Sequence, residues 1–275
     1  MSNVVLITGC STGIGRDLTM HLSQAGYQVV GTARNMESLE DLPSALKLPL
    51  DVTQADSIHA AVAQTLERFG QINVLVNNAG YALPGALEEI PVEQVQQMFD
   101  VNVFGVLRMI RAVTPHMRKQ RAGRIINISS IAGKLSTPVN GAYSATKFAV
   151  EALSDALRVE LEPFGIQVIV VEPGSIKTQF DQTAHTHARE ILSNSTSPYR
   201  PLYRLSDQFA ASMRHREIGP EIVSEVIQEA IETSRPKARY HAGIPFSGEL
   251  MLQLGDSVWD LALRRIFKID PSNTN

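Results

Sequence analysis

The residues best suited to chemistry in this sequence are Tyr143 and Lys147, which lie four positions apart. On a helix such a pair shares one face, one turn apart. An ammonium beside a phenol favours the phenolate, so the tyrosine pKa should fall from about 10 toward neutrality. A phenol tuned in this way can give or take a proton at physiological pH. A surface tyrosine above a solvated lysine has the same spacing, so the rest of the chain must decide.

A glycine-rich turn lies about 130 residues before this pair. It follows an apolar strand at 4–8 and opens a helix predicted at 13–25. Glycines let the backbone approach a pyrophosphate, and the amides and positive dipole end of the helix attract anions. A turn that serves only close packing is the alternative. The residues that we expect to contact a dinucleotide here are Gly9, Ser11, Thr12, Gly13, Ile14 and Gly15.

The end of the second predicted strand indicates which dinucleotide. A site for the unphosphorylated ribose usually has an Asp or Glu at this position, about 20 residues on. Here Ala33 stands in that place and Arg34 follows it. A guanidinium can pair with a 2′-phosphate in forked geometry. The sequence therefore favours NADP(H) over NAD(H), with an ordinary surface arginine as the alternative.

Two further strand ends carry candidate cofactor contacts. Asp51 and Val52 follow the third strand, where a carboxylate can accept the adenine amino group. Asn78, Ala79 and Gly80 follow the fourth strand. In open parallel sheets, ligands collect outside these carboxyl ends. The asparagine could instead serve only the turn.

Short apolar runs alternate with helical patterns along the chain, which predicts a single doubly wound, Rossmann-like α/β domain over 1–275. Several runs are apolar on both faces, so we expect a mostly parallel sheet flanked by helices on both faces. Strands are predicted at 4–8, 28–32, 45–50, 74–76, 124–128 and 167–171. Helices are predicted at 13–25, 54–69, 92–120 with an interruption near Asn102, and 143–163.

The pattern changes at about residue 180, and we expect 180–275 to form a variable substrate-pocket segment with C-terminal helices. Residues 185–204 suggest a loop or short helices, while 220–233 and 248–267 are helical and 238–241 is a short strand. The apolar helix at 248–267 could cover the pocket or pack on the sheet, which we favour over contact with a membrane surface.

Composition excludes several other classes. The net charge is −3, so nothing suggests a nucleic-acid partner. Cys10 is the only cysteine, which excludes an internal disulfide. No histidine pattern suggests a metal site. No run approaches the roughly 20 apolar residues that span a bilayer, and no leader peptide is evident, so we expect a cytoplasmic protein.

Taken together, these motifs resemble the short-chain dehydrogenase/reductase family over 4–178. Their order and gaps match as well as their residue types. The matching pieces are Thr8-Gly-x-x-x-Gly-x-Gly15, Asp51, Asn77-Asn-Ala-Gly80, Asn102, Ser130, Tyr143-x-x-x-Lys147 and Pro173-Gly174.

The resemblance implies a catalytic tetrad and a hydride-transferring oxidoreductase. The tetrad would be Asn102, Ser130, Tyr143 and Lys147, with Tyr143 and Lys147 also at the cofactor. Tyr143 would exchange the proton, Ser130 would stabilise the oxyanion, and Lys147 would also hold the nicotinamide ribose. The segment around the nicotinamide would be Pro173, Gly174, Ile176 and Thr178.

The resemblance also bears on substrate and assembly. The chain is similar to the branch with hydroxysteroid and retinol dehydrogenases and acyl-dihydroxyacetone-phosphate reductases, which implies a bulky, apolar ketone or secondary alcohol. A 3-oxoacyl reductase and a non-catalytic NADP(H)-sensing regulator are the alternatives. Family members often pair through helices that correspond to 92–120 and 143–163, so a homodimer or homotetramer is expected.

Overall fold

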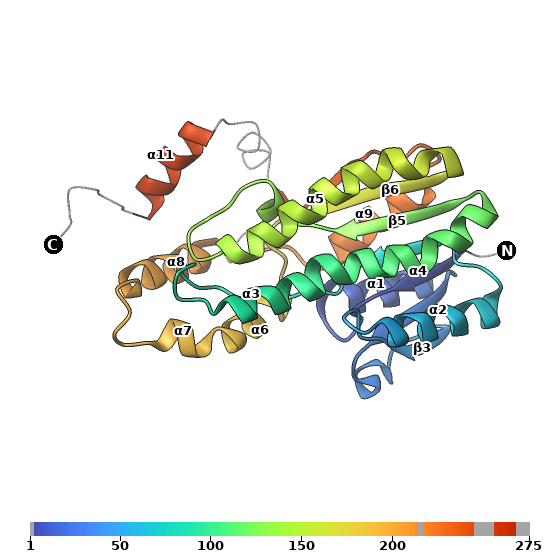
Figure 1. Cartoon of the computed structure of the whole chain (residues 1–275), viewed down its shortest axis with the longest axis horizontal. Helices are drawn as coiled ribbons and strands as arrows, with labels where there is room; N and C mark the ends of the chain where they lie inside the picture. Colours follow the sequence, from blue (N-terminus) through green and yellow to red (C-terminus); the bar gives the residue numbers. More distant parts are fainter. Residues whose placement is uncertain (1–2, 214–216, 245–255, 268–275) are drawn as a thin grey trace.

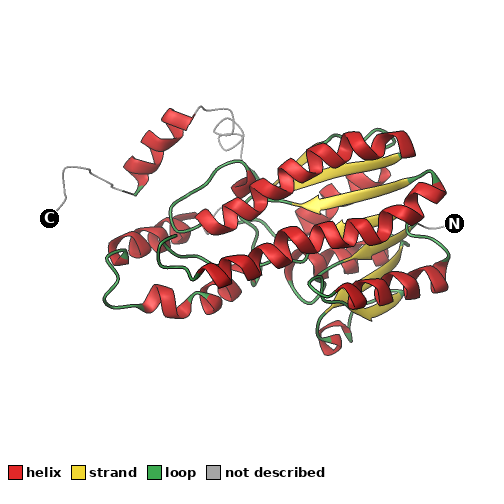
Figure 2. Cartoon of the chain, viewed as in Figure 1, coloured by secondary structure: helices red, strands yellow, loops and turns green. Residues whose placement is uncertain are grey.

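One parallel sheet positions the rest of the molecule. The computed structural model describes residues 3–213, 217–244 and 256–267. Seven strands run in the order β3-β2-β1-β4-β5-β6-β7, and every neighbouring pair is parallel. The sheet is drawn in yellow in Figure 2. They are β1 (Val4–Ile7), β2 (Gln28–Ala33), β3 (Leu46–Pro49), β4 (Val74–Asn77), β5 (Gly123–Ile128), β6 (Ile166–Pro173) and β7 (Arg239–Ala242). The predicted architecture is confirmed, and each predicted strand is present.

The helices fall into two sets, of which one packs on the sheet and the other extends past its end. The first set is α1 (Gly13–Gln24), α2 (Ala55–Phe69), α4 (Gly105–Gln120), α5 (Gly141–Leu161) and α9 (Glu221–Glu232). The second is α3 (Val92–Phe99), α6 (Phe180–His187), α7 (Arg189–Ser193), α8 (Arg200–Met213) and α11 (Asp256–Ile266).

Both faces of the sheet are covered because its strands are apolar on both sides. Successive side chains of a strand point to opposite faces. Along β1, Val4 and Leu6 therefore join one core cluster while Val5 and Ile7 join another. The first cluster includes side chains of α2, α4 and α5, and the second includes those of α1 and α9, which lie on opposite faces (Figure 1).

The predicted interruption of the long helix near Asn102 is confirmed. Helix α3 passes through one π-helical turn at Asp100–Phe104 before α4 begins. Such a turn carries an extra residue, and π-bulges often mark functional positions. Asn102 is 1% exposed, so the turn delivers a polar side chain into the interior.

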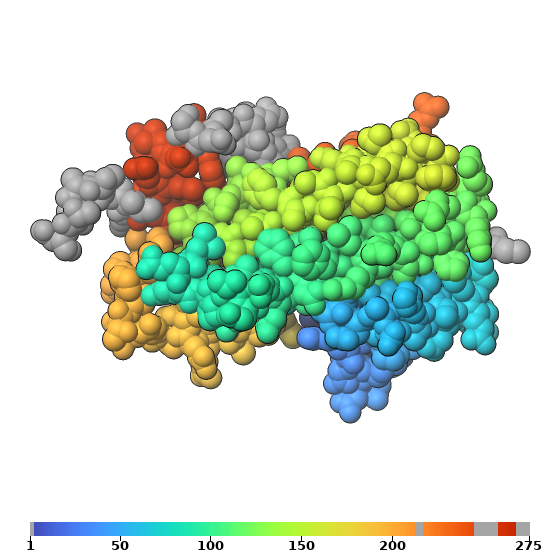
Figure 3. Space-filling view, in the orientation of Figure 1, coloured from blue at the N-terminus to red at the C-terminus, as the bar shows by residue number. Residues whose placement is uncertain are grey.

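The chain after β6 forms what we call the cap, namely α6, α7 and α8 (180–213). Where the sequence predicts a loop or short helices at 185–204, the structure has helices, and α8 continues to Met213. The cap packs against residues near 83–98 (Figure 3). The predicted helix at 220–233 is confirmed as α9. Helix α11 confirms 256–266 of the predicted 248–267, and 248–255 lie outside the described residues.

Candidate active site at the carboxyl ends of the strands

The glycine turn after β1 has the geometry of a close-approach site. Gly9 and Gly13 have φ of +75° and +58°, a region that side chains with a Cβ rarely occupy. A Cβ on Gly15 would lie 2.3 Å from the Gly9 carbonyl oxygen. Cys10 is fully buried between them, and burial raises the pKa of its thiol to about 11. The glycines are therefore required both by the conformation of the turn and by its close internal packing.

Helix α1 begins without a side-chain cap. Thr12 stands at its N-cap with extended backbone, but its hydroxyl accepts no amide, and the first turn has no acidic residue. Ile14 packs into the core behind the turn. The first amides and the positive end of the helix dipole are therefore available to an anion, as a pyrophosphate requires.

Asn78 and Ala79 fasten this turn from the neighbouring strand. Their backbone amides each donate to Thr8 Oγ1 at 3.0 Å, and Asn78 Nδ2 donates to the carbonyls of Thr8 and Gly9, both at 2.9 Å. The structure therefore places Asn78 as a support of the turn. A Cβ on Gly80 would lie 3.1 Å from Asn102 Oδ1 and 3.9 Å from Lys147 Nζ, so this segment links the turn to the tetrad.

Arg34 lies one residue past β2, with its side chain exposed. Among the described residues its guanidinium has no hydrogen bond or ion pair, although its charge lowers the pKa of Tyr81 against the larger effect of burial. Asp51 Oδ1 accepts from the amide and hydroxyl of Thr53 at 2.9 and 2.7 Å. Val52 is buried against Gly105 at the start of α4. Because these residues follow β2 and β3, which run parallel to β1, they lie at the same end of the sheet as the glycine turn.

The structure brings the four predicted tetrad residues together from three parts of the chain. Lys147 Nζ lies 5.7 Å from the centre of the Tyr143 ring and donates to the Ile128 carbonyl at 2.8 Å. The Ser130 hydroxyl lies within hydrogen-bonding reach of the Tyr143 hydroxyl and lowers its pKa. The convergence on which the predicted chemistry depends is present.

The expected direction of the Tyr143 pKa is wrong. Although part of the residue is accessible, burial raises the pKa of its hydroxyl above the ordinary value, and the nearby charge of Asp181 raises it further. Burial also lowers the pKa of Lys147 to about 8, against an opposing effect of Glu151. Desolvation penalises the charged form of both groups, which outweighs the attraction expected from their spacing.

Asn102 holds its neighbours through all of its side-chain polar atoms. Its Nδ2 donates to the Tyr81 carbonyl at 2.8 Å and to Thr146 Oγ1 at 3.1 Å, and its Oδ1 accepts from the Tyr81 amide at 3.0 Å. It therefore ties the π turn to the segment after β4 and to the turn of α5 between Tyr143 and Lys147.

The Pro173–Gly174 turn is held by segments that the motif alone does not reveal. The Gly174 amide donates to the Ala242 carbonyl at 2.8 Å, and Ile176 forms a parallel bridge with Ile218. Thr178 reaches back to the glycine turn, since a Cβ on Gly13 would lie 3.4 Å from its Cβ. The turn therefore closes over the start of α1.

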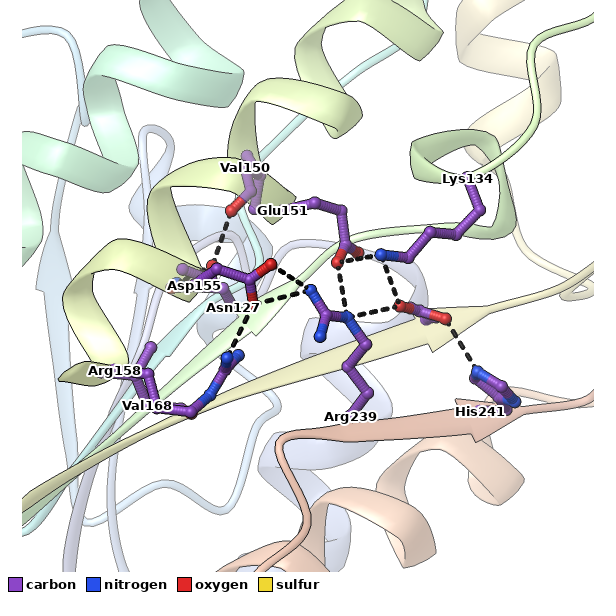
Figure 4. Close-up of polar contacts among 11 residues, drawn as sticks. Asn127, Lys134, Val150, Glu151, Asp155, Arg158, Val168, Arg239 and His241 are labelled. Atoms are coloured by element: carbon purple, nitrogen blue, oxygen red, sulfur yellow. Dashed lines mark hydrogen bonds and ion pairs between the residues drawn. The ribbon is translucent and has the colours of Figure 1, made fainter. Parts of the chain in front are cut away.

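A buried charge cluster that the sequence does not reveal lies where α5, β6 and β7 meet (Figure 4). Glu172 at the end of β6 is fully buried, and Glu151, one turn beyond Lys147, is 5% exposed. Glu151 Oε2 pairs with Lys134 Nζ and Arg239 Nε, both at 3.0 Å. Glu172 pairs with the same two bases and, at 2.9 Å, with His241. Burial followed by the charge of Glu151 raises the pKa of Glu172.

An apolar wall adjoins Tyr143 on the cap side. The Phe180 ring lies 5.7 Å from that of Tyr143, and the Tyr81 ring meets His187 edge-on at 5.2 Å. The other side chains of this cluster are Leu83, Ile90, Val95, Met98, Ala142, Ala188, Ile191 and Leu192. Of the apolar residues after 180, Phe180 and Leu192 thus lie beside the tetrad, while Phe209 packs on Phe267.

Hydrogen bonds join the cap to the segment before α3. The Tyr203 hydroxyl accepts from the Ala86 amide at 3.1 Å and donates to Glu89, and the Tyr199 hydroxyl donates to Glu88 at 2.7 Å. Spacing alone gave no sign of these pairs, because they join residues more than 100 positions apart.

Comparison with known proteins decides the family. The sequence model described as short chain dehydrogenase matches residues 3–189. The chain belongs to this family. It is therefore an oxidoreductase of carbonyl or alcohol substrates, with a small-molecule substrate and a nicotinamide cofactor expected. The glycine cradle and uncapped helix fit such a cofactor.

Relatives match along nearly the whole length. The 3-ketodihydrosphingosine reductase of Bacteroides thetaiotaomicron is 45% identical over 272 residues, which cover 97% of this chain and 98% of the relative. Human retinol dehydrogenase 8 is 34% identical over 96% of this chain and 89% of its own. A short chain dehydrogenase/reductase from Burkholderia phymatum, solved with NAD, has a TM-score of 0.80 at 27% identity, over 95% of each chain. Structures with NADP also match.

Two findings concern metal and membrane. Within 3–213, 217–244 and 256–267, side chains that could ligate a metal do not gather in groups of three or more. Among those same residues, every helix is too short or too polar to cross a bilayer.

Proposed function

We propose that the chain is an NADPH-dependent ketoreductase of long-chain, apolar ketones, and that 3-ketodihydrosphingosine is the substrate to test first. The observation that carries this is the 45% identity with the Bacteroides reductase along 97% of this chain and 98% of that one. This similarity extends through the cap, the region that we expect to shape the substrate pocket.

The residues around the glycine turn would hold the dinucleotide. Amides of Ser11, Thr12 and Ile14 would receive the pyrophosphate at the start of α1, and Asp51 would accept from the adenine amino group. Arg34, exposed and without a hydrogen-bond or ion-pair partner among the described residues, would pair with a 2′-phosphate in forked geometry. Ile176 and Thr178 would border the nicotinamide.

Bound NADPH would supply a hydride to the carbonyl carbon. As charge grows on the carbonyl oxygen, the hydroxyls of Tyr143 and Ser130 would donate hydrogen bonds to it. Tyr143 then transfers its proton to that oxygen. A raised pKa keeps the phenol protonated at neutral pH, which suits the proton donor of a reduction. The Lys147 ammonium would stabilise the phenolate that remains.

The walls of the site support an apolar substrate. The cluster beside Tyr143 is aliphatic apart from the Tyr81 and Tyr143 rings. An alkyl chain that replaces water along such a wall gains roughly 0.8 kcal/mol per buried methylene.

The test is the oxidation of NADPH by purified protein with a panel of ketones, followed by absorbance. We expect 3-ketodihydrosphingosine to have the highest kcat/KM among this ketone, a steroid ketone, retinal and a 3-oxoacyl thioester. A thioester as the best substrate would replace the proposal with the 3-oxoacyl reductase. Binding of NADPH without turnover of any ketone would favour the sensor.

We also propose that the chain pairs through α4 and α5. Phe104 beside α4 is 49% exposed, and Phe148 and Val159 on α5 are 45% and 70% exposed. Apolar side chains of this size on two neighbouring helices suit an interface. Light scattering should give a dimer or tetramer, and Val159→Asp should shift it toward monomer. A wild-type monomer would contradict the pairing.

A further inference from the structure

Lys134 links the segment that carries Ser130 to helix α5. It directly follows η3 (Ile131–Gly133), a short 3-10 helix that has Ser130 at its N-cap. Its Nζ atom pairs with Glu151 Oε2 on α5 at 3.0 Å and lies 3.7 Å from Glu172 Oε1 on β6 (Figure 4). One cation therefore joins the end of η3 to a helix and a strand that both border the tetrad.

The segment from Ser130 to Lys134 is bonded to itself at every step. The Ser130 Oγ atom accepts from the Ala132 amide at 3.1 Å. The Gly133 amide donates to the Ser130 carbonyl at 2.9 Å, and the Lys134 amide donates to the Ile131 carbonyl at 3.0 Å. A shift of Lys134 is therefore passed to Ser130. Because Oγ accepts within the segment, its own proton is left for another acceptor.

Helix η3 lies directly against the turn of α5 that carries Lys147. A Cβ on Gly133 would lie 3.1 Å from Glu151 Cγ and 3.2 Å from the Lys147 carbonyl oxygen. Close-packed segments pass small displacements on to each other. This contact sets the spacing between η3 and α5, and the ion pair between Lys134 and Glu151 adds a polar bond across it. Together they fix where η3 lies along α5.

The two carboxylates are firm anchors because they are buried. Glu151 is 5% exposed and Glu172 is fully buried, and a buried carboxylate needs a cation beside it to stay charged. Arg239 Nε lies 3.0 Å from Glu151 Oε2 and 3.3 Å from Glu172 Oε1, and His241 also pairs with Glu172. Loss of Lys134 would leave each carboxylate with a base, so it would free η3 while the rest of the cluster stays paired.

We propose that Lys134 is a positioning residue, which holds the Ser130 hydroxyl at the oxygen of the reacting carbonyl by tethering η3 to α5. The inference rests on the proposed function, in which Ser130 donates to that oxygen as charge grows on it. The benefit of such a hydrogen bond depends steeply on placement. A loosened η3 should therefore slow the chemical step while NADPH and the ketone still bind.

The experiment is a double-mutant cycle between Lys134→Met and Ser130→Ala, followed by single-turnover reduction of 3-ketodihydrosphingosine with NADPH. In the wild-type background, Lys134→Met should slow the chemical step about tenfold. The KM and the NADPH dissociation constant should stay within about twofold. In the Ser130→Ala background the same substitution should change the rate less than about twofold, because the hydroxyl that it positions is gone. Lys134→Arg, which keeps a cation, should restore most of the rate.

The matched control is Arg239→Met, which removes a base from the same two carboxylates but lies on β7. It should lower the melting temperature, and any effect on the rate should be the same in the wild-type and Ser130→Ala backgrounds. If Lys134→Met does not fold, Lys134→Gln, which keeps a hydrogen-bond donor, takes its place in the cycle.

The outcomes separate this inference from the function beneath it. An equal loss of rate from Lys134→Met in both backgrounds would mean that Lys134 supports the fold as a whole, and a wild-type rate in Lys134→Met would mean that η3 needs no tether. Either result overturns the inference and leaves the ketoreductase in place. If the wild type reduces no ketone, or if Ser130→Ala keeps the full rate, the proposed chemistry fails and the inference fails with it.

Discussion

The strand-end site and the cap are built in different ways. Around the glycine turn, each hydrogen bond from the segment after β4 has a backbone group as donor or acceptor, as when the Asn78 and Ala79 amides donate to Thr8 Oγ1 at 3.0 Å. The cap depends on side chains, as when Tyr203 and Tyr199 meet Glu89 and Glu88. The first arrangement tolerates little change and suits a fixed cofactor. The second can be altered by single substitutions, which suits a region that selects substrates.

This contrast sets the size of each expected effect. Changes in the strand-end site should alter catalysis or cofactor choice strongly and leave substrate preference largely as it was. Changes in the cap should alter the KM for ketones with little effect on NADPH. Substitutions in each region test that division, and the largest effect is expected at Tyr143.

Tyr143→Phe should have the largest effect. Removing the proton donor and one oxyanion hydrogen bond should lower kcat about 1,000-fold or more. The dissociation constant for NADPH, measured by fluorescence titration, should stay within about twofold, because that hydroxyl faces the carbonyl. Loss of NADPH binding together with turnover would make Tyr143 structural instead.

Lys147→Ala should lower both the turnover rate and the affinity for NADPH. Without the ammonium, the phenolate loses its stabilising charge and the cofactor loses a contact, so kcat should fall on the order of 100-fold and NADPH affinity about tenfold. Stopped-flow turnover and equilibrium titration measure the two separately. A normal affinity for NADPH would mean that Lys147 acts on Tyr143 and does not contact the cofactor.

Arg34→Asp should change cofactor choice without changing the ketone. Losing a forked pair with the 2′-phosphate and adding a carboxylate should shift the ratio of kcat/KM for NADPH over NADH toward NADH by about 10- to 100-fold. Arg235→Asp, at an exposed residue in the loop after α9, is a suitable control. An unchanged ratio would show that Arg34 does not recognise the 2′-phosphate.

Glu151→Gln should shift a pH profile. The Glu151 charge raises the pKa of Lys147, which burial lowers to about 8, so its removal should lower that pKa further. If the ammonium is the active form, kcat should then decline at lower pH than in the wild type. Asp155→Asn, one turn on and more exposed, is the control. If kcat declined at the wild-type pH instead, the charge of Glu151 would have no effect on the pKa of Lys147.

Tyr203→Phe should have the smallest effect. It removes the hydroxyl that joins α8 to Ala86 and Glu89, at a cost of about 1 kcal/mol. The KM for a long-chain ketone should rise a few-fold while kcat and NADPH affinity hold. Equal changes with NADPH and ketone would contradict the division between the two regions.

The glycine turn and the parallel strands could be predicted because the information that specifies them is local. Glycines at 9, 13 and 15 are required by φ or by close approach, and apolar runs on both faces predict buried parallel strands. The tetrad positions were available through motif spacing, and the structure brings them together.

What the sequence could not predict depends on distant partners or on burial. Glu172 looks like one more strand residue until Arg239 and Lys134 are placed around it. The pKa of Tyr143 was predicted in the wrong direction because spacing reveals the neighbouring ammonium and says nothing of desolvation.

The central claim is that hydride passes from NADPH to the ketone carbon held at Tyr143. Its most direct test uses NADPH with two deuterium atoms at C4 of the dihydronicotinamide and 3-ketodihydrosphingosine, with the product analysed by mass spectrometry. We expect one deuterium, on the carbon that carries the new hydroxyl, in the wild type and almost no product with Tyr143→Phe. A reduced product without deuterium at that carbon would contradict the account.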